Sequence, residues 1–138
     1  MNAQVSTAQI KAVVVGDIPA HRLLWLYASE DGETMRVGLP KERGNYVDFV
    51  STRELKDGEE VTVTIKNDPI WLVEAAEKLL PGANVYADST GRLIGSYSKH
   101  LHSVGYILDA AQEGDVVRLV RNYKFYSDRL PLDESQEE

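Results

Sequence analysis

The feature that most constrains the fold of this chain is internal self-similarity. When the 138-residue sequence is shifted against itself, strand-like runs and turn glycines match along most of its length. The matches pair residues 26–28 with 85–87 at a shift of 59, Val47 with Val104 at 57, and Gly58 with Gly114 at 56. The shift only decreases, as expected if a second copy has shorter loops. The sequence therefore predicts a tandem duplication over roughly 11–66 and 70–122. The alternative is chance, because strands and glycine turns recur in any β-rich chain.

Each copy is a series of short strand-like runs separated by turn residues. Residues 61–65 (VTVTI) alternate with a period of two, which is typical of a half-buried strand. Asp31-Gly32 and Thr90-Gly91 are turn signals, because glycine accepts a positive φ without steric cost. Such signals recur about every 8 to 12 residues, which is the spacing of a sandwich or barrel. Strands are expected at 11–15, 23–28, 34–37, 46–50, 61–65, 70–73, 84–87, 93–95, 104–108 and 116–120.

One segment also has the local features of a helix. Asp68-Pro69 precedes IWLVEAAEKLL and Pro81-Gly82 follows it, which gives an N-cap, a proline at the first helical position and a terminator. The matching stretch of the first copy contains Gly16 and Pro19, which exclude a regular helix. We therefore expect a strand at 70–73 and at most one or two helical turns at 75–80. The predicted fold class is mostly β, a small barrel or sandwich built from two tandem β-repeats with at most one short helix.

The ends of the chain differ from its centre. They are polar and lack periodicity, which predicts a flexible N-terminal arm at 1–10 and an acidic flexible tail at 131–138, flanking β-repeats at 11–66 and 67–130. The net charge is −7, but the last six residues carry four of these negative charges, so residues 1–132 are only −3. This balance predicts no global attraction to nucleic acid.

Several classes of chemistry are excluded or disfavoured. The chain has no cysteine, which excludes a disulfide framework, a thiolate metal site and a cysteine nucleophile. No run of about 18 apolar residues and no signal peptide is present, so we expect a soluble protein made in the cytoplasm, with no membrane partner. The phosphate-binding patterns GxGxxG and GxxxxGK[ST] are also absent.

His100 and His102 are two residues apart, a spacing that a pair of metal ligands can have. On a strand they project to the same face, but no third ligand is suitably spaced, so we expect two exposed histidines of a polar loop. A small hydrolase using His100 or His102 is an alternative, although the neighbouring Ser96, Ser98 and Ser103 lie in no nucleophile elbow. We therefore expect no enzymatic activity, no metal and no cofactor.

Residues 118–129 (RLVRNYKFYSDR) interleave basic and aromatic side chains. Three interpretations remain open. Such a strip is typical of single-stranded nucleic-acid grooves, of a final strand with one packed and one solvated face, and of a protein-binding edge, because Tyr and Arg are favoured at interfaces. The candidate partner-binding residues are Arg121, Tyr123, Lys124, Phe125 and Tyr126.

The second copy carries a recognisable string. Residues 80–93 (LPGANVYADSTGRL) and 104–119 (VGYILDAAQEGDVVRL) read as strand, tight turn, strand, variable loop, strand, turn and closing strand. This pattern resembles the small β-rich capsid decoration, or head cement, proteins of tailed phages, over about 40 residues and, through the weaker first copy, about 110. The first copy departs from the pattern at two positions. Trp25 replaces a small or polar residue, and Asp48 replaces the glycine that matches Gly105.

The resemblance implies a structural virion protein. Such a protein, made in the host cytoplasm, binds the major capsid protein on the outside of an expanded head, commonly as a trimer at local threefold positions, and stabilises the head without catalysis. Met1–Gln9 would then order on a neighbouring subunit as an arm. The alternative is a nucleic-acid-binding β-barrel that uses the basic aromatic strip at 118–129.

Overall fold

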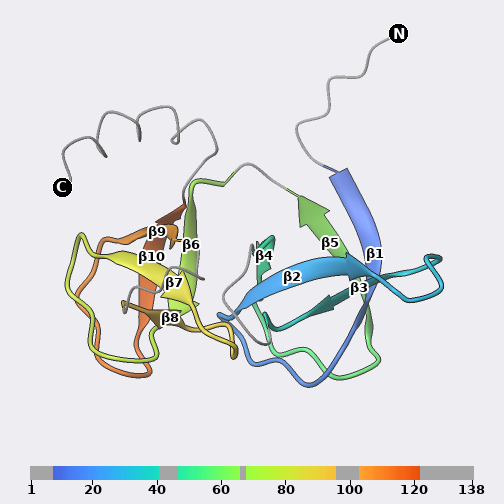
Figure 1. Ribbon diagram of the computed structural model, residues 1–138, viewed down its shortest axis with the longest axis horizontal. Helices are drawn as coiled ribbons and strands as arrows, with labels where there is room; N and C mark the ends of the chain where they lie inside the picture. Colours follow the sequence, from blue (N-terminus) through green and yellow to red (C-terminus); the bar gives the residue numbers. More distant parts are fainter. Residues whose placement is uncertain (1–7, 41–46, 66–67, 96–102, 122–138) are drawn as a thin grey trace, which may run out of the picture.

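The computed structural model describes residues 8–40, 47–65, 68–95 and 103–121. These residues form ten strands and contain no helix, so none of them forms a helix that could cross a membrane (Figure 1). The strands are β1 Ala8–Val14, β2 Leu23–Ala28, β3 Met35–Gly38, β4 Phe49–Val50, β5 Glu60–Ile65, β6 Ile70–Glu74, β7 Asn84–Ala87, β8 Leu93–Ile94, β9 Ser103–Ile107 and β10 Val116–Arg121. The predicted mostly-β fold class is confirmed.

The strands make two five-stranded sheets, one from each half of the chain (Figure 1). The first has the order β4-β2-β3-β1-β5 and the second β6-β10-β9-β7-β8. When β6 to β10 are matched in sequence with β1 to β5, the two orders are the same ring, opened at different places. In the second sheet the ends of the ring meet, because Ala75 bridges Leu93 in parallel, as β1 pairs with β3 in the first. In the first sheet the described residues include no pairing between β4 and β5, so there the ring is open.

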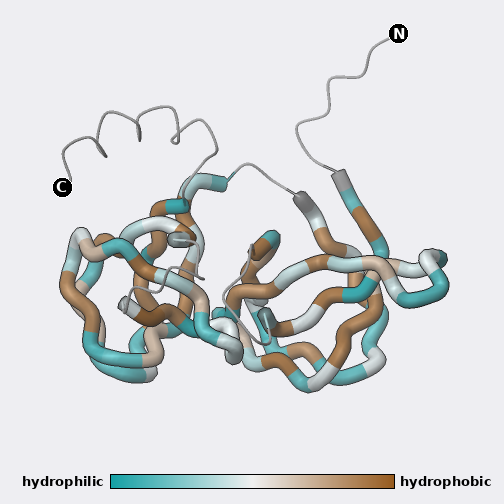
Figure 2. The backbone as a smooth tube through the Cα atoms, in the orientation of Figure 1, coloured by the Kyte–Doolittle hydropathy of each residue, from teal (hydrophilic) through white to brown (hydrophobic). Residues whose placement is uncertain are grey.

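Each sheet curls around its own apolar core (Figure 2). Burying one Val, Leu or Ile side chain contributes about 1.5–3 kcal/mol, so each cluster is a substantial source of stability. The first core contains Ala12, Val14, Ile18, Leu24, Val37 and Leu55. The second contains Leu23, Val73, Ala75, Leu79, Val85, Ala87, Leu93, Ile107, Ala111, Val117 and Leu119. Leu23 and Leu24 are neighbours on β2 but belong to different cores, so β2 connects the two halves.

Direct backbone contacts join the halves at this point. The Leu23 N–H donates to the Gly91 carbonyl at 2.8 Å, and the Glu74 N–H donates to the His21 carbonyl at 2.9 Å. Gly91 has a φ of +82°, and a Cβ at this position would lie 2.6 Å from the Leu23 carbonyl oxygen. Arg22 adds an ion pair, with Nε 3.4 Å from Glu74 Oε1. Gly91 therefore allows the close approach of the two halves.

The structure refines several predicted elements. Residues 75–80 form no helix, because Leu79 pairs instead with Ala111 through two backbone hydrogen bonds of 3.0 and 2.9 Å. The strand expected at 46–50 is shorter, since β4 contains only Phe49–Val50. Residues 8–10, grouped above with the N-terminal arm, lie in β1 and pair with β5. The boundaries proposed for the arm, the repeats and the tail stay predictions.

Candidate partner-binding surface

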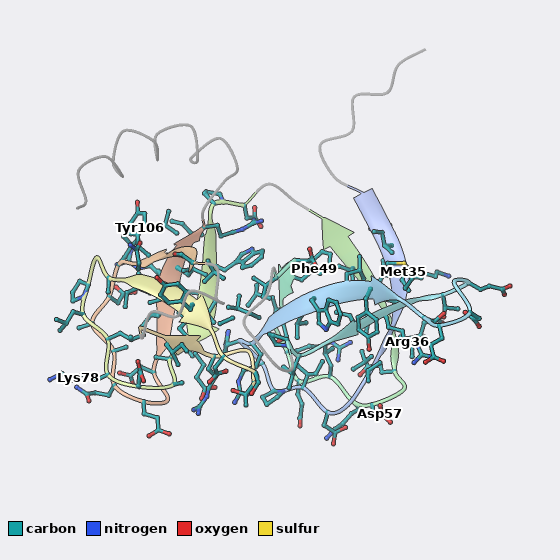
Figure 3. The ribbon with its side chains drawn as sticks, in the orientation of Figure 1. Met35, Arg36, Phe49, Asp57, Lys78 and Tyr106 are labelled. Atoms are coloured by element: carbon teal, nitrogen blue, oxygen red, sulfur yellow. The ribbon has the colours of Figure 1, made fainter. Side chains whose placement is uncertain are left out.

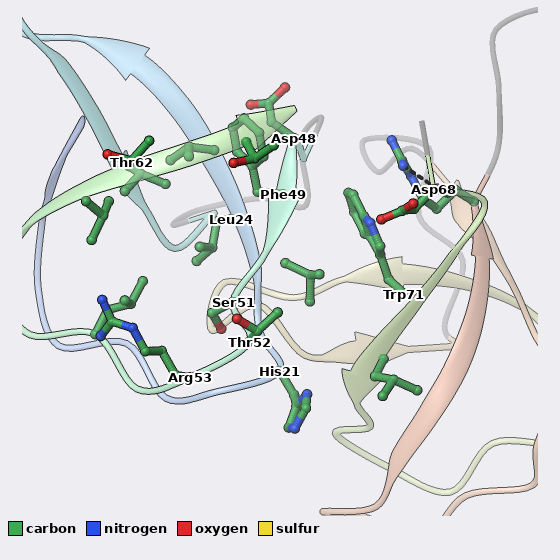
Figure 4. Close-up of a pocket in the computed structure, with 18 of the residues that line it drawn as sticks. His21, Leu24, Asp48, Phe49, Ser51, Thr52, Arg53, Thr62, Asp68 and Trp71 are labelled. Atoms are coloured by element: carbon green, nitrogen blue, oxygen red, sulfur yellow. Dashed lines mark hydrogen bonds between the residues drawn. The ribbon is translucent and has the colours of Figure 1, made fainter. Parts of the chain in front are cut away.

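A groove of about 660 Å³ lies where the first ring is open (Figure 4). Val61–Thr64 of β5 form one wall, and Phe49 and Val50 of β4 form another. Ile70–Leu72 of β6 and Arg121 of β10 contribute from the second half of the chain. The groove is therefore built by both halves.

The β5 strand has one free edge in this groove. It is the last strand of its sheet, and among the described residues only β1 pairs with it. Unpaired N–H and C=O groups on such an edge are a ready template for another strand. The open edge also exposes side chains, because Val61 and Val63 are only half-buried, whereas their counterparts Val117 and Leu119 are 1% and 0% exposed.

The equivalent strands of the second sheet are paired. β9 and β10 are antiparallel, and Gly105 lies opposite Arg121. Gly105 has a φ of +146°, and a Cβ there would lie 1.9 Å from the Val120 carbonyl oxygen, so no side chain fits. At a shift of 57 the residue in the first copy is Asp48. A side chain at this position, as in Asp48, does not fit the close approach that Gly105 makes in the second sheet.

Asp48 instead holds its segment against β2. Its N–H donates to the Leu24 carbonyl at 2.7 Å, and its Oδ2 accepts from the Leu26 N–H at 2.8 Å. The residue as a whole is exposed, but its carboxylate lines the groove, and desolvation there raises the pKa of the Asp48 carboxyl above its ordinary value. The carboxylate therefore caps the β2 backbone beside the unpaired edge of β5.

The β4 strand faces differently from its counterpart β9. Val50 packs against the second core, together with Val47, while Phe49 packs against the first. In β9 the residue equivalent to Phe49 is Tyr106, which is 41% exposed (Figure 3). β4 is therefore shared between the two cores, and this position leaves β5 uncovered.

Arg121 and Trp71 define the rim of the groove on the second half. The Arg121 guanidinium carbon lies 3.9 Å from the centroid of the Trp71 ring, a cation–π contact. Its Nη1 donates to the Asp68 carbonyl at 2.6 Å. Ile70 and Leu72, on the same strand as Trp71, are 44% and 49% exposed. An ordered arginine beside exposed apolar side chains is typical of a protein-binding surface.

Of the partner-binding residues predicted from the sequence, one lies in the groove. Arg121 lines the groove, whereas Tyr123, Lys124, Phe125 and Tyr126 lie outside the described residues. Sequence reasoning noted Asp48 only as a departure from the repeat, and it missed Trp71 and the free edge of β5. The substitution of Asp48 for a glycine was the available signal, since it marks the position at which the two copies cannot pair alike.

Arg118, the first residue of the basic aromatic strip, has a different role. It forms a double contact with Asp109, with Nη2 2.7 Å from Oδ1 and Nε 3.1 Å from Oδ2. This side-chain hydrogen bonding lowers the pKa of Asp109 to about 2. Arg118 does not line the groove, and its guanidinium is bound to Asp109 of the same half.

Other candidate chemistry is sparse. Within the described parts of the chain no three His, Cys, Asp or Glu side chains gather in a way that would hold a metal ion. His100, His102, Ser96 and Ser98 lie outside the described residues. Ser103 is described, and its hydroxyl donates to the Val85 carbonyl at 3.3 Å, which is a structural contact between strands.

Comparison with known proteins identifies a related fold. No protein-family model and no curated protein sequence matches the chain. Among solved structures, the N base of head fiber gp8.5 of bacteriophage phi29 is similar, with a TM-score of 0.73 and 22% sequence identity. The match covers 84% of this chain and 94% of that one. At this identity the similarity establishes a shared fold.

Proposed function

We propose that this chain is a structural protein of a tailed-phage head that decorates the outer surface of the expanded capsid and stabilises it. One observation carries the proposal: the chain has the fold of a phage head-fiber base over 84% of its length. The decoration-protein pattern at 80–93 and 104–119 points to the same class of protein independently. The role requires no catalytic residue and no cofactor.

The partner in this proposal is the major capsid protein, bound by a trimer of this chain. A trimer at a local threefold position repeats each contact three times, so modest individual contacts add up to a high avidity. Arg121, with Trp71 and the exposed Ile70 and Leu72, supplies the arginine, aromatic and apolar groups that anchor protein interfaces. The proposed contact also includes the aromatic and basic residues that follow Arg121 in the sequence, Tyr123, Lys124, Phe125 and Tyr126.

The N-terminal arm is a second proposed contact. β1 begins at Ala8 and pairs with β5 from its first residue, so the segment before Ala8 would be the part that reaches a neighbouring subunit. A chain that lacks residues 1–7 should keep its fold and bind heads less tightly. Unchanged binding by that variant would remove the arm from the proposal.

The contacts of Arg118 and Arg121, the two arginines of the basic aromatic strip that the structure describes, weaken the nucleic-acid alternative. Arg118 is paired with Asp109, and Arg121 contacts the Trp71 ring and the Asp68 carbonyl. Both guanidinium groups therefore already have partners within the protein, with which a phosphate would have to compete. Binding of a single-stranded oligonucleotide that is lost in Arg121→Ala/Lys124→Ala would favour the alternative.

Cosedimentation with expanded, decoration-free heads tests the proposed function. Saturable binding, with a stoichiometry set by the capsid lattice, is expected. No binding by folded protein to intact heads would overturn the proposal.

A further inference from the structure

We propose that copies of this chain associate through the outer face of the second sheet, which is formed by β6, β10 and β9. The inference rests on the trimer of the proposed function, because it assigns the surface at which the copies meet. The partner is a second copy of this chain. The chemistry that recognises it is an apolar sheet face on which every charge has an opposite charge beside it.

Exposed apolar side chains gather on this face. Alternate residues of the three strands point into the second core, among them Ile107, Val117 and Leu119, so the residues between them point outward. The described residues include six large hydrophobic side chains that are exposed, and five of them lie on this face. These five are Ile70 at 44%, Leu72 at 49%, Tyr106 at 41%, Leu108 at 38% and Val116 at 44% (Figure 3).

Strand pairing makes these side chains one continuous patch. β10 lies between β6 and β9 and is hydrogen-bonded to both, so residues of the three strands stand side by side in rows. The Leu108 N–H extends the pairing by donating to the Arg118 carbonyl at 3.0 Å. The first row consists of Ile70, Val120 and Tyr106, and the second of Leu72, Arg118 and Leu108.

The fold does not require an apolar surface at this position, because the first half has a polar one. The strands β1 and β5 correspond there to β6 and β10: Val14 accepts a hydrogen bond from the Gly58 N–H as Ala75 accepts one from the Gly114 N–H. An apolar face in one half alone indicates an interaction surface. The exposed side chains on the outer face of β1 and β5 are Gln9, Lys11, Glu60, Thr62 and Thr64.

The cation at the centre of the face is already neutralised. The Nη2 of Arg118 lies 2.7 Å from Oδ1 of Asp109, which follows Leu108 in the chain. Arg121, the other charged residue of β10, has its guanidinium on the Trp71 ring at the groove rim instead. An arginine fixed among apolar side chains is the kind of residue that anchors a protein interface.

The acid at the end of β6 is also paired. Glu74 Oε1 lies 3.4 Å from Arg22 Nε, and its Oε2 lies 3.3 Å from Arg92 Nη1. The same Arg92 nitrogen lies 3.8 Å from Glu113 Oε2. The two arginines and the two glutamates cancel, so this border adds no net charge to the face.

A second copy is the occupant that this chemistry fits. The net charge of −7 makes copies of the chain repel one another, so their association needs a neutral face. Interfaces between identical chains are more apolar than other interfaces and are depleted in charged residues at their centre. The same face on another copy supplies the matching apolar surface. A standard interface buries about 800 Å² per partner, so this face forms the apolar centre and polar residues around it form the rim.

The face adjoins the surface proposed for the capsid without coinciding with it. Ile70 and Leu72 also line the groove, so they lie at the boundary between the two surfaces. Tyr106 and Val116 lie on the face and do not line the groove. Substitutions at these two residues therefore test the contact between copies alone.

The mass of the full chain in solution, measured by sedimentation equilibrium, tests the inference. We expect an assembly with the mass of three chains. Tyr106→Lys/Val116→Lys places two cations in the face and should raise the dissociation constant of the assembly by about a hundredfold or more. Thr62→Lys/Thr64→Lys, on the outer face of the first sheet, is the matched control and should leave the mass unchanged.

Urea denaturation shows that the variants are folded. Both substituted side chains of Tyr106→Lys/Val116→Lys are exposed, so a single cooperative transition is expected. Leu108→Lys, which follows β9 and lies on the same face, is a second variant with the same expected loss of association.

An equal mass of the wild-type chain and of the folded face variants, whether of one chain or of several, would overturn the inference. So would an equal dissociation of the control. Cosedimentation with decoration-free heads separates this failure from that of the proposed function. An assembly that the face variants dissociate, together with heads that stay bare, would contradict the proposed function and support this inference.

Discussion

The two halves of this protein use the same ring of five strands and differ at one seam. We use this word for the boundary between β9 and β10 in the second half and for the equivalent boundary between β4 and β5 in the first. In the second half β9 and β10 pair, and the ring is joined by the Ala75–Leu93 bridge. In the first half β4 and β5 are separated by a groove. The comparison teaches that the closed boundary includes a close backbone contact, which Gly105 permits and a side chain such as that of Asp48 does not.

The consequences for stability and for binding are opposite. The closed half buries Val117 and Leu119 fully, while the open half leaves Val61 and Val63 half-buried. In the open half no described strand pairs with the outer edge of β5, and such an edge is a usual basis of peptide recognition by sheets. Local departures from an ideal fold often mark functional sites, and the first half of this chain departs at its seam.

The largest effect is expected from opening the closed seam. Gly105→Asp makes the second half resemble the first, and its Cβ would meet the Val120 carbonyl at 1.9 Å. The free energy of unfolding should fall by about 3 kcal/mol or more in urea denaturation. Asp48→Gly, at the equivalent position, should cost about 1 kcal/mol, mainly through the lost cap on Leu26. Similar losses for the two variants would refute the account of the seam.

Next in size is the junction between the halves. Gly91→Ala places a Cβ 2.6 Å from the Leu23 carbonyl and should lower the free energy of unfolding by about 2–3 kcal/mol. Gly32→Ala is the matched control, because Gly32 occupies the equivalent turn, has a φ of +73° and has open space around it. Its cost should be about 1 kcal/mol. An equal cost at both positions would mean that the junction contact contributes nothing.

Equivalent valines compare burial in the two rings. Val117→Ala removes two methyl groups from a closed core, and we expect a loss of about 2 kcal/mol. Val61→Ala, at the equivalent position beside the groove, should cost about half as much, because Val61 is only half-buried. Calorimetry measures both. A larger loss for Val61→Ala would show that the groove is covered and packed as tightly as the closed core.

The smallest effect is a difference in pH dependence. The pKa of Asp109, lowered to about 2 by Arg118, means that its contribution is present above the ordinary carboxyl pKa near 4 and is lost as the pH falls toward 2. Asp109→Asn should therefore make acid unfolding less steep in that window.

Asp48 titrates in the opposite sense. Desolvation raises its pKa, so ionisation opposes folding, and stability is lost as the pH rises from the ordinary carboxyl pKa through the raised one. Asp48→Asn should remove that loss. The same slope change in Asp48→Asn and Asp109→Asn, measured by urea denaturation at several pH values, would contradict the two assignments.

Local patterns predicted most of the fold. The alternation of VTVTI predicted β5, and the turn glycines placed the hairpins, because both are properties of neighbouring residues. The helix signals around Asp68-Pro69 were overridden by non-local pairing of Leu79 with Ala111. The basic aromatic strip led to Arg121 at the groove rim.

The groove itself was beyond sequence reasoning. It depends on which strands fail to pair, and β4 is displaced because Val50 packs on the core of the other half. That contact joins residues far apart in the chain, which no local pattern records. The replacement of glycine by Asp48 identified the position but not its consequence.

The central claim is that this chain decorates a phage head. Cryo-electron microscopy of expanded, decoration-free heads incubated with the purified chain tests it most directly. The account predicts added density at symmetry-related positions on the outer surface, with threefold symmetry and a fit to the two-ring fold. Heads that stay bare in the presence of folded protein would contradict the claim.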